Sequence, residues 1–464
     1  MEYDTLLDTS ARIRRRDVSP VEVTEAMLDR IERLDAGHRA YATVLAERAM
    51  EQARTAEAEI ARGIWRGPLH GVPIAVKDLC YTTFAPTTGG TRIHRDFLPD
   101  YNATVVDRLE AAGAVMLGKL KMTEGAYTSH HPDVDPPLNP WGEGHWAGSS
   151  SSGSGVGPAA GLCYGSLGSD TGGSIRFPSA ANGLTGIKPT WGRVSRHGVF
   201  ALADSLDHVG PMARSAGDAA AILGIIAGAD DNDPTSLRAE VPDYLAELHD
   251  GVRGMTIGID RSYAFDGVDP EAAAALSAAE AVFRSLGAKI KEVSFPPHER
   301  LVSLWIPMCA VETAIAHRET YPARKDDYGP ELAGLIEEGR ALSGLDLCDI
   351  LHERLAFNGG LTAMFEEVDA FLIPTMPMRL PSLAELASFG DDPDVLVRLL
   401  RFTAPFDFSG TPTITLPNGF DSAGLPLSMQ LAGPSLSEGR LARAAHAFQT
   451  QTDWHTLRPE KGVI

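Results

Sequence analysis

Two stretches of small residues hold the side chains best suited to chemistry. The first, 147–154, reads Ala-Gly-Ser-Ser-Ser-Ser-Gly-Ser, and the second, 168–176, reads Gly-Ser-Asp-Thr-Gly-Gly-Ser-Ile-Arg. Asp170 and Arg176 flank a Gly-Gly pair, and glycine lets the backbone approach another group closely. The chain then runs directly into apolar segments, which is not typical of a flexible Gly/Ser linker. These two stretches therefore predict a binding or catalytic site.

Most generic motifs of catalysis and ligand binding are absent from the sequence. It contains no GxxxxGK[ST] phosphate loop, no GxGxxG dinucleotide motif, and neither a GxSxG nor an SxxK serine motif. His130 and His131 are adjacent, so they point apart on a helix or a strand and are not expected to share a metal ion. Four scattered cysteines without CxxC spacing predict free thiols. We expect neither a metal nor a cofactor.

The elements that must position these residues begin with a β-α-β order. A Val/Ile run at 71–78 predicts a buried strand that carries Lys77 at its C-terminal end. Residues 104–112 form a helical pattern and 114–118 the next strand. The preceding segment, 6–62, is expected to be helical.

Strands and helices continue to alternate along the rest of the chain. Alternation on this scale predicts an α/β fold with a mixed or mainly parallel sheet and helices on both faces. The predicted strands are 255–259, 289–295, 368–374, 413–416 and 427–431; the predicted helices are 215–228, 269–286 and 437–451, with 299–365 mostly helical.

Composition favours one large globular domain. The chain has 464 residues, of which 44% are hydrophobic and 22% charged, and no linker or internal repeat interrupts it. A formal net charge of -21 disfavours binding to nucleic acid or anionic membranes, and it suits a neutral or cationic small substrate. The acidic first residues lack the apolar segment of a secretory signal, so we expect a cytoplasmic protein.

Several blocks in a fixed order resemble the amidase signature family. The resemblance extends over nearly the whole chain, and it implies that family's fold: a single α/β domain with a mixed, mainly parallel sheet. We interpret residues 1–65 as a helical segment packed on the core, 70–215 as the catalytic core and 299–410 as a helical region lining the substrate pocket. The blocks are Gly71-x-Pro73-x-x-x-Lys77-Asp78, the two small-residue stretches, 186–195, 205–211, 373–375 and 424–430.

The resemblance also implies roles for individual residues. Ser174 would be the nucleophile, Ser150 a bridging serine preceded by a cis peptide bond, and Lys77 the base. The backbone N–H groups of Thr171, Gly172, Gly173 and Ser174 would form an oxyanion hole. This assignment agrees with chemistry, because a serine hydroxyl needs a nearby base, and lysine serves as one only when burial lowers its pKa.

Other small and charged residues are expected to support this set. Asp170 and Arg176 would clamp the turn before Ser174, and Ser149 and Ser151 flank the bridging serine. The commoner family form has glycine where this chain has Ser149 and Ser152. This departure affects local backbone detail more than the chemistry, since serine fits most turns.

The resemblance implies a serine hydrolase that cleaves C(O)–N bonds through an acyl-enzyme. Amides are the first expected substrates, and anilides, esters and carbamates (urethanes) are further candidates. One alternative is a protein that releases ammonia from glutamine for partner chains, which would need a carboxylate-binding arginine such as Arg401. Another is a non-catalytic binding protein on the same scaffold. The expected assembly is a monomer or a homodimer.

The substrate pocket is expected from the segment 122–146 and from 299–410. Mixed aromatic and small polar side chains there suggest a neutral, partly apolar substrate. The candidates are Tyr127, Thr128, Ser129, His130, Trp146, Trp305, Met308, Phe402 and Phe406.

Overall fold

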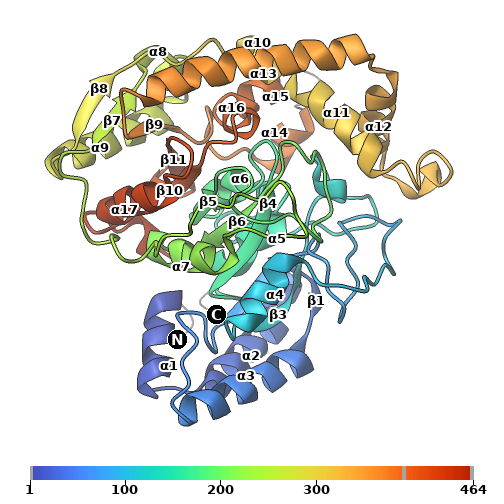
Figure 1. Cartoon of the computed structure of the whole chain (residues 1–464), viewed down its shortest axis with the longest axis vertical. Helices are drawn as coiled ribbons and strands as arrows, with labels where there is room; N and C mark the ends of the chain where they lie inside the picture. The colour runs from blue at the N-terminus through green and yellow to red at the C-terminus, as the bar shows by residue number, and fades with distance from the viewer. Residues whose placement is uncertain (1–3, 389–392, 460–464) are drawn as a thin grey trace.

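One twisted sheet runs through the molecule (Figure 1). The computed structural model describes residues 4–388 and 393–459. Within these ranges the sheet has 11 strands in the order β1-β3-β2-β4-β6-β5-β10-β11-β9-β7-β8. Their bounds are β1 Tyr41–Val44, β2 Pro73–Lys77, β3 Val115–Leu120, β4 Gly165–Asp170, β5 Thr185–Lys188, β6 His208–Ala213, β7 Thr256–Ile259, β8 Lys289–Glu292, β9 Ala370–Pro374, β10 Thr413–Phe420 and β11 Pro426–Ala432.

The sheet is mixed, as predicted, but the expectation of a mainly parallel sheet is wrong. Among the described residues, β2 pairs in parallel with β3 and β4, and β7 with β8 and β9, whereas the six other pairings are antiparallel. The β-α-β pattern predicted the parallel parts. The antiparallel centre comes partly from a short turn that joins β10 to β11, a connection that only antiparallel strands allow.

Helices cover the sheet and extend beyond both of its ends. Figure 1 shows the N-terminal helices in blue at one end of the molecule and α10–α13 in yellow and orange at the other. The helices are α1 Leu6–Arg15, α2 Pro20–His38, α3 Ala46–Ala61, α4 Thr104–Ala111, α5 Ser152–Ala159, α6 Arg176–Ala181, α7 Ala216–Ile226, α8 Arg261–Phe265, α9 Pro270–Ser285, α10 Glu299–Ser303, α11 Trp305–Ala316, α12 Pro330–Ala341, α13 Gly344–Phe365, α14 Leu383–Ser388, α15 Pro393–Leu400, α16 Ala404–Phe408 and α17 Glu438–Gln449, with 3-10 turns η1 Glu124–Ala126, η2 Lys325–Asp327 and η4 Trp454–Thr456.

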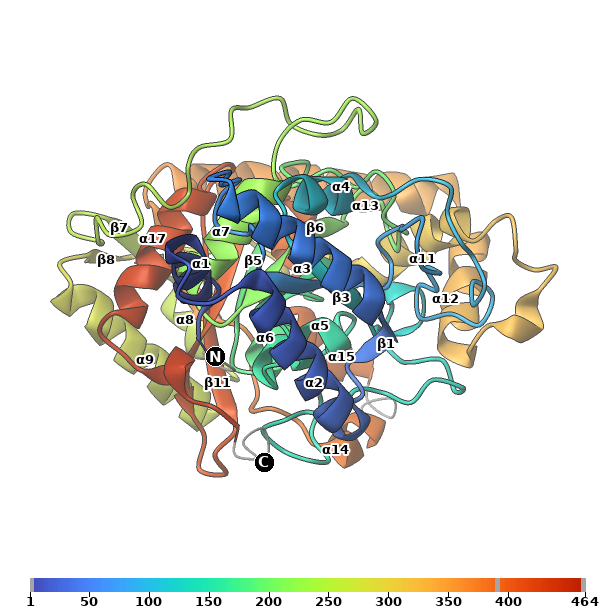
Figure 2. The same ribbon diagram turned by 90° about the horizontal axis from the view of Figure 1, so that it is seen from below.

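The N-terminal segment is helical with one interruption. Ser19 begins α2 by accepting a hydrogen bond from the N–H of Glu22, whose side chain accepts from the N–H of Ser19 in return. Figure 2 shows α2 and α3 side by side, with α3 against β3. Strand β1 lies between these two helices in the sequence and pairs with β3, which the helical pattern over 6–62 did not predict.

The two regions proposed from the sequence correspond to continuous parts of this fold. Residues 70–215 contain β2 to β6, and 299–410 contain α10 to α16 together with β9. Residues 389–392 of the second region, and 1–3 and 460–464 of the predicted domain, lie outside the described residues. No helix in the described ranges is both long enough and apolar enough to cross a membrane.

Candidate active site

Lys77 ends strand β2 with its ammonium group fully buried. The side chain is 0% exposed, and Nζ lies 2.7 Å from the hydroxyl of Ser150 and 2.8 Å from that of Ser169. Residue 77 reaches both serines because β2 pairs directly with β4, the strand that carries Ser169. The fold therefore brings Lys77 to Ser150, as expected, and adds Ser169, which was not predicted.

The first serine stretch forms the entry to helix α5. The peptide bond between Ser149 and Ser150 is cis, as the resemblance implied. The carbonyl of Ser150 accepts a hydrogen bond from the N–H of Thr123 at 3.1 Å. Ser151 exchanges two hydrogen bonds with the backbone of Ser169, at 3.1 and 3.2 Å. These contacts fix the bridging serine beside β4.

The second stretch forms a tight turn, residues 170–176, between β4 and α6, which we call the catalytic turn. Ser174 is the half-buried residue within Thr171–Ser174, whose other members are buried. The N–H of Gly173 donates to Asp170 Oδ1 at 2.6 Å, so it is already used and does not fit the predicted four-donor oxyanion hole. The N–H groups of Thr171, Gly172 and Ser174 have no acceptor within the described residues. Of the four predicted donors, only the N–H of Gly173 already has a partner.

Asp170 and Arg176 are joined to each other at the two ends of the turn. The Arg176 guanidinium donates to both oxygens of Asp170, at 2.8 and 3.0 Å, and both side chains are 0% exposed. Burial disfavours the Asp170 anion, but Arg176 and nearby N–H groups outweigh burial and hold the Asp170 pKa well below its usual range. Asp170 is therefore a permanent anion at the base of the turn.

Burial also tunes the electrostatics around Lys77. Desolvation lowers the Lys77 pKa from 10.5 to about 7, and the carboxylates of Asp207 and Asp170 oppose this shift. Asp207 accepts a hydrogen bond from Thr171 Oγ1 at 2.6 Å. Burial raises the Asp207 pKa to about 7, against the effect of this and other donors. Lys77 is thus able to exchange a proton near neutral pH.

Trp305, predicted as a pocket residue, covers the catalytic turn. Its indole Nε1 donates to the carbonyl of Thr171 at 2.8 Å. A Cβ atom added to Gly172 would lie 2.5 Å from the indole ring, so only glycine fits beneath it. Tyr127 stacks on Trp305 with ring centroids 6.4 Å apart. Both aromatic residues therefore belong to the site.

Polar residues of the predicted pocket segment lie in different surroundings. His130 Nε2 is 3.1 Å from the hydroxyl of Ser152, and burial lowers the His130 pKa to about 4, so the imidazole is neutral near pH 7. Thr128 donates instead to the carboxylate of Glu331 on α12. Ser129 is exposed. Of these three, only His130 contacts the first serine stretch among the described residues, at Ser152.

Three predicted pocket residues belong to the hydrophobic core. Phe402 and Phe406 are 0% exposed and Met308 is 3% exposed. Phe402 packs edge-on against Tyr263, which explains why apolar character alone could not separate core from pocket. Trp146 is half-buried and packs on Phe177, just after the catalytic turn.

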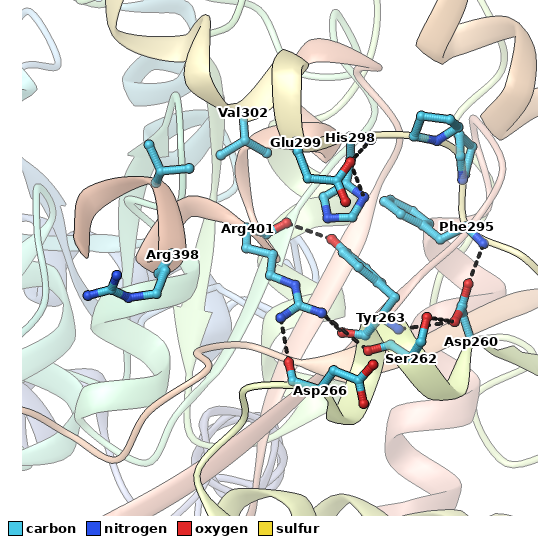
Figure 3. A pocket seen from close by; sticks show the side chains of 13 residues that line it. Asp260, Ser262, Tyr263, Asp266, Phe295, His298, Glu299, Val302, Arg398 and Arg401 are labelled. Atoms are coloured by element: carbon cyan, nitrogen blue, oxygen red, sulfur yellow. Dashed lines mark hydrogen bonds and ion pairs between the residues drawn. The ribbon is translucent and has the colours of Figure 1, made fainter. Parts of the chain in front are cut away.

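Arg401 lines a separate cavity of about 610 Å³ (Figure 3). Its guanidinium donates to the backbone carbonyls of Ser262, Tyr263 and Asp266, at the end of α8. The cavity lining contains none of the residues predicted for catalysis. The Arg401 guanidinium is therefore bound to backbone carbonyls in this separate cavity. It does not fit the role of an arginine that binds the carboxylate of a substrate.

No group of three or more His, Cys, Asp or Glu residues in the described ranges could hold a metal ion. All four cysteines are free, and three of them are buried. His131 Nδ1 accepts from the N–H of Asp133 at 3.0 Å, which is a local turn contact.

Sequence reasoning missed three residues around the site: Ser169, Asp207 and Asp407. Ser169 lies inside the small-residue stretch, and Asp207 lies in the block 205–211, so both were within recognised motifs. Asp407 Oδ2 accepts a hydrogen bond from Arg176 at 2.6 Å. No motif marks Asp407, and only the folded chain brings it to the turn.

The chain resembles known proteins over nearly its whole length. Residues 22–442 match the family model described as Amidase. AmiD of Mycobacterium tuberculosis (strain ATCC 25618 / H37Rv) is 50% identical over 454 residues, covering 98% of this chain and 95% of AmiD. One component of the glutamyl-tRNA(Gln) amidotransferase of Geobacter sp. (strain M21) is 38% identical over 477 residues, covering 97% of this chain and 98% of that component.

A solved structure extends the likeness to three dimensions. The structure of 6-aminohexanoate cyclic dimer hydrolase complexed with substrate has a TM-score of 0.90 and 25% sequence identity, and 99% of each chain is covered. Together with the family match over residues 22–442, these likenesses identify the chain as a member of the amidase family.

Proposed function

We propose that the protein is a serine hydrolase that cleaves the C(O)–N bond of small neutral amides. Ser174 is the nucleophile, and Lys77 acts as its base through the hydroxyl of Ser150. The observation that carries this proposal is the buried 2.7 Å contact between Lys77 Nζ and Ser150 Oγ, combined with a Lys77 pKa of about 7. A neutral lysine in that position can accept a proton that a solvated lysine would already hold.

The reaction then proceeds in two steps, acylation of Ser174 and hydrolysis of the acyl-enzyme. Ser174 Oγ forms a bond to the amide carbon while its proton passes to Ser150, whose own proton passes to Lys77. The N–H groups of Gly172 and Ser174 stabilise the oxyanion. When the C–N bond breaks, Lys77 returns a proton through Ser150 to the leaving amine. Water then attacks the acyl-enzyme by the same proton route, which releases the acid and restores Ser174.

The proposed substrate class follows from the charge of the molecule and from the aromatic side chains beside the turn. The net charge of -21 favours neutral over anionic substrates, because an acidic surface repels anions at low ionic strength. Tyr127 and Trp305 beside the turn favour a partly apolar acyl or amine group. Anilides, esters and carbamates contain the same reacting carbonyl, and the catalytic residues do not distinguish them.

A second candidate function is release of ammonia from glutamine for partner chains. Its support is the 38% identity to the amidotransferase component over 97% of this chain. This function would need an arginine that binds the carboxylate of glutamine. Arg401, the candidate, already donates to three backbone carbonyls. We therefore favour the free-standing amidase.

Turnover of a substrate panel by the purified protein tests the proposal. We expect hydrolysis of a neutral primary amide or an anilide to exceed that of glutamine. Ser174→Ala is expected to lower turnover by roughly 10⁴-fold or more, because nothing replaces the nucleophile. Ser277→Ala, an exposed serine on α9, serves as the matched control. Glutamine as the only substrate, or full amide turnover in Ser174→Ala, would contradict the proposal.

A further inference from the structure

Two buried carboxyl groups share one guanidinium behind the catalytic turn. Arg176 Nη2 donates to Asp170 Oδ1 at 2.8 Å and to Asp407 Oδ2 at 2.6 Å. All three side chains are 0% exposed. Arg176 Nη1 also donates to the carbonyl of Thr403 at 2.8 Å, so the start of α16 is attached to the same guanidinium. A single positive charge thus faces two acidic side chains.

The other ionisable groups nearby do not supply a second close cation. His208 Nδ1 lies 3.6 Å from Asp407 Oδ1, and burial lowers the His208 pKa well below its usual value, so the ring is neutral. Lys188 Nζ lies 3.1 Å from His208 Nε2 and donates to the carbonyls of Thr411 and Pro189. Burial lowers the Lys188 pKa to about 7. The charges of Lys188 and Arg176 lower the Asp407 pKa, but burial outweighs both.

The two carboxyl groups differ in how well an anion would be stabilised. Asp170 accepts hydrogen bonds from the N–H groups of Gly173 and Ile175 in addition to Arg176. Asp407 accepts only from Arg176, and its Oδ1 is buried without a hydrogen-bond partner within the described residues. A buried anion with a bare oxygen is costly, and two carboxylates in one site do not both ionise readily. The proton therefore belongs on Asp407.

We propose that Asp407 is a positioning residue that holds the catalytic turn through Arg176 as a neutral carboxylic acid. The O–H of the acid hydrogen-bonds to the Asp170 carboxylate, and Asp407 Oδ2 accepts a hydrogen bond from Arg176. Burial, together with this hydrogen bond to Asp170, keeps the Asp407 pKa well above its usual value. The inference rests on the proposed function for its catalytic consequence, whereas the protonation state is independent of it.

The neutral state has a consequence for the oxyanion. Asp170 fixes the N–H of Gly173 and so sets the direction of the neighbouring N–H groups of Gly172 and Ser174. A second anion behind the turn would repel the negative charge that develops in front of it. A neutral acid keeps Arg176 in place without adding that charge.

Two substitutions at Asp407 separate the neutral acid from an anion. Asp407→Asn keeps the shape and a donor without charge, so we expect it to keep kcat within roughly 3-fold of wild type. Asp407→Ala removes the support of Arg176, and a displaced turn is expected to lower kcat by roughly 10- to 100-fold, with KM changed much less. Asp218→Asn is the matched control, because Asp218 is a fully buried carboxyl that accepts from Leu7 far from the turn. Equal losses in the Asn and Ala variants, or full kcat in Asp407→Ala, would overturn the proposal.

Infrared spectroscopy reads the protonation state directly. We expect the wild-type spectrum minus that of Asp407→Asn, at about pH 8, to contain the C=O band of a protonated carboxylic acid, although an ordinary Asp with a pKa of about 3.9 is ionised there. A carboxylate band in its place would overturn the proposal even if Asp407→Ala failed to fold. Because this measurement needs no substrate, it determines the protonation state of Asp407 even if the protein shows no amidase activity.

Discussion

Lys77 is the residue on which the proposed proton transfer depends. Its side chain is completely buried, yet two serine hydroxyls lie within hydrogen-bond distance of Nζ. Burial favours the neutral amine, whereas the negative charges of Asp170 and Asp207 favour the ammonium ion. The balance leaves a base that titrates near neutral pH rather than near 10.5.

The pH dependence of turnover tests this balance. Since Lys77 must be neutral to accept a proton, kcat/KM should fall as the pH decreases through about 7 and reach a plateau above it. Lys77→Met should lower amide turnover by roughly 10²- to 10⁴-fold and remove this acidic limb. Lys289→Met, an exposed lysine on β8, should change neither. An unchanged profile in Lys77→Met would show that another group is the base.

Motifs in the sequence point to individual residues of the proposed site but not to the residues that surround them. Lys77, Ser150 and the Asp170–Arg176 pair were recognisable because motifs and short spacings mark them. Asp407 was not, because it comes from α16, 231 residues beyond Arg176. Phe402 was predicted to line the pocket but lies in the core. An aromatic residue in the sequence does not by itself indicate which of the two it will join.

At the scale of elements, the site depends on contact between α11 and the turn that follows β4. Trp305 begins α11, donates to Thr171 and covers Gly172. The indole therefore limits how far the turn can move away from the position that an oxyanion requires. In the proposed mechanism, helix α11 holds the turn in place and supplies no reacting group.

Gly172→Ala tests this contact. The added Cβ would lie 2.5 Å from the Trp305 ring, so the turn or the indole must shift. We expect kcat to fall by roughly 10- to 100-fold, because displacement by about 1 Å has that effect on aligned groups. Gly359→Ala on α13, where nothing lies within 4 Å of the new Cβ, is the control and should keep wild-type kcat. Wild-type kcat in Gly172→Ala would mean that the turn is not held by α11.

The elements themselves were predictable where their composition was typical. The apolar strands β2 and β9 and the Ala-rich helix α9 appear where the patterns indicated. Strand β4, Gly-Ser-Leu-Gly-Ser-Asp, has almost no β-branched residue, and its pairing with β2 and β6 stabilises it instead. Strand β4 also carries Ser169 and Asp170, two residues of the proposed site.

At the scale of the whole molecule, one sheet joins all parts of the site. Lys77 ends β2, the catalytic turn follows β4, and Asp407 lies on α16 just before β10; these three strands belong to the same 11-stranded sheet of the described residues. Charge acts at this scale too: a net charge of -21 is spread over the molecule, while the site contains Lys77 and Arg176 in buried positions. The family match likewise extends over most of the chain, residues 22–442.

The most direct test of the central claim is covalent labelling followed by intact-mass measurement. A serine-directed fluorophosphonate should add one group to each wild-type chain, and peptide mapping should place it on Ser174, because a serine activated by a neutral lysine attacks such reagents. Ser174→Ala should take up none, and Lys77→Met should react far more slowly. Labelling of another residue, with Ser174→Ala still active on amides, would contradict the account.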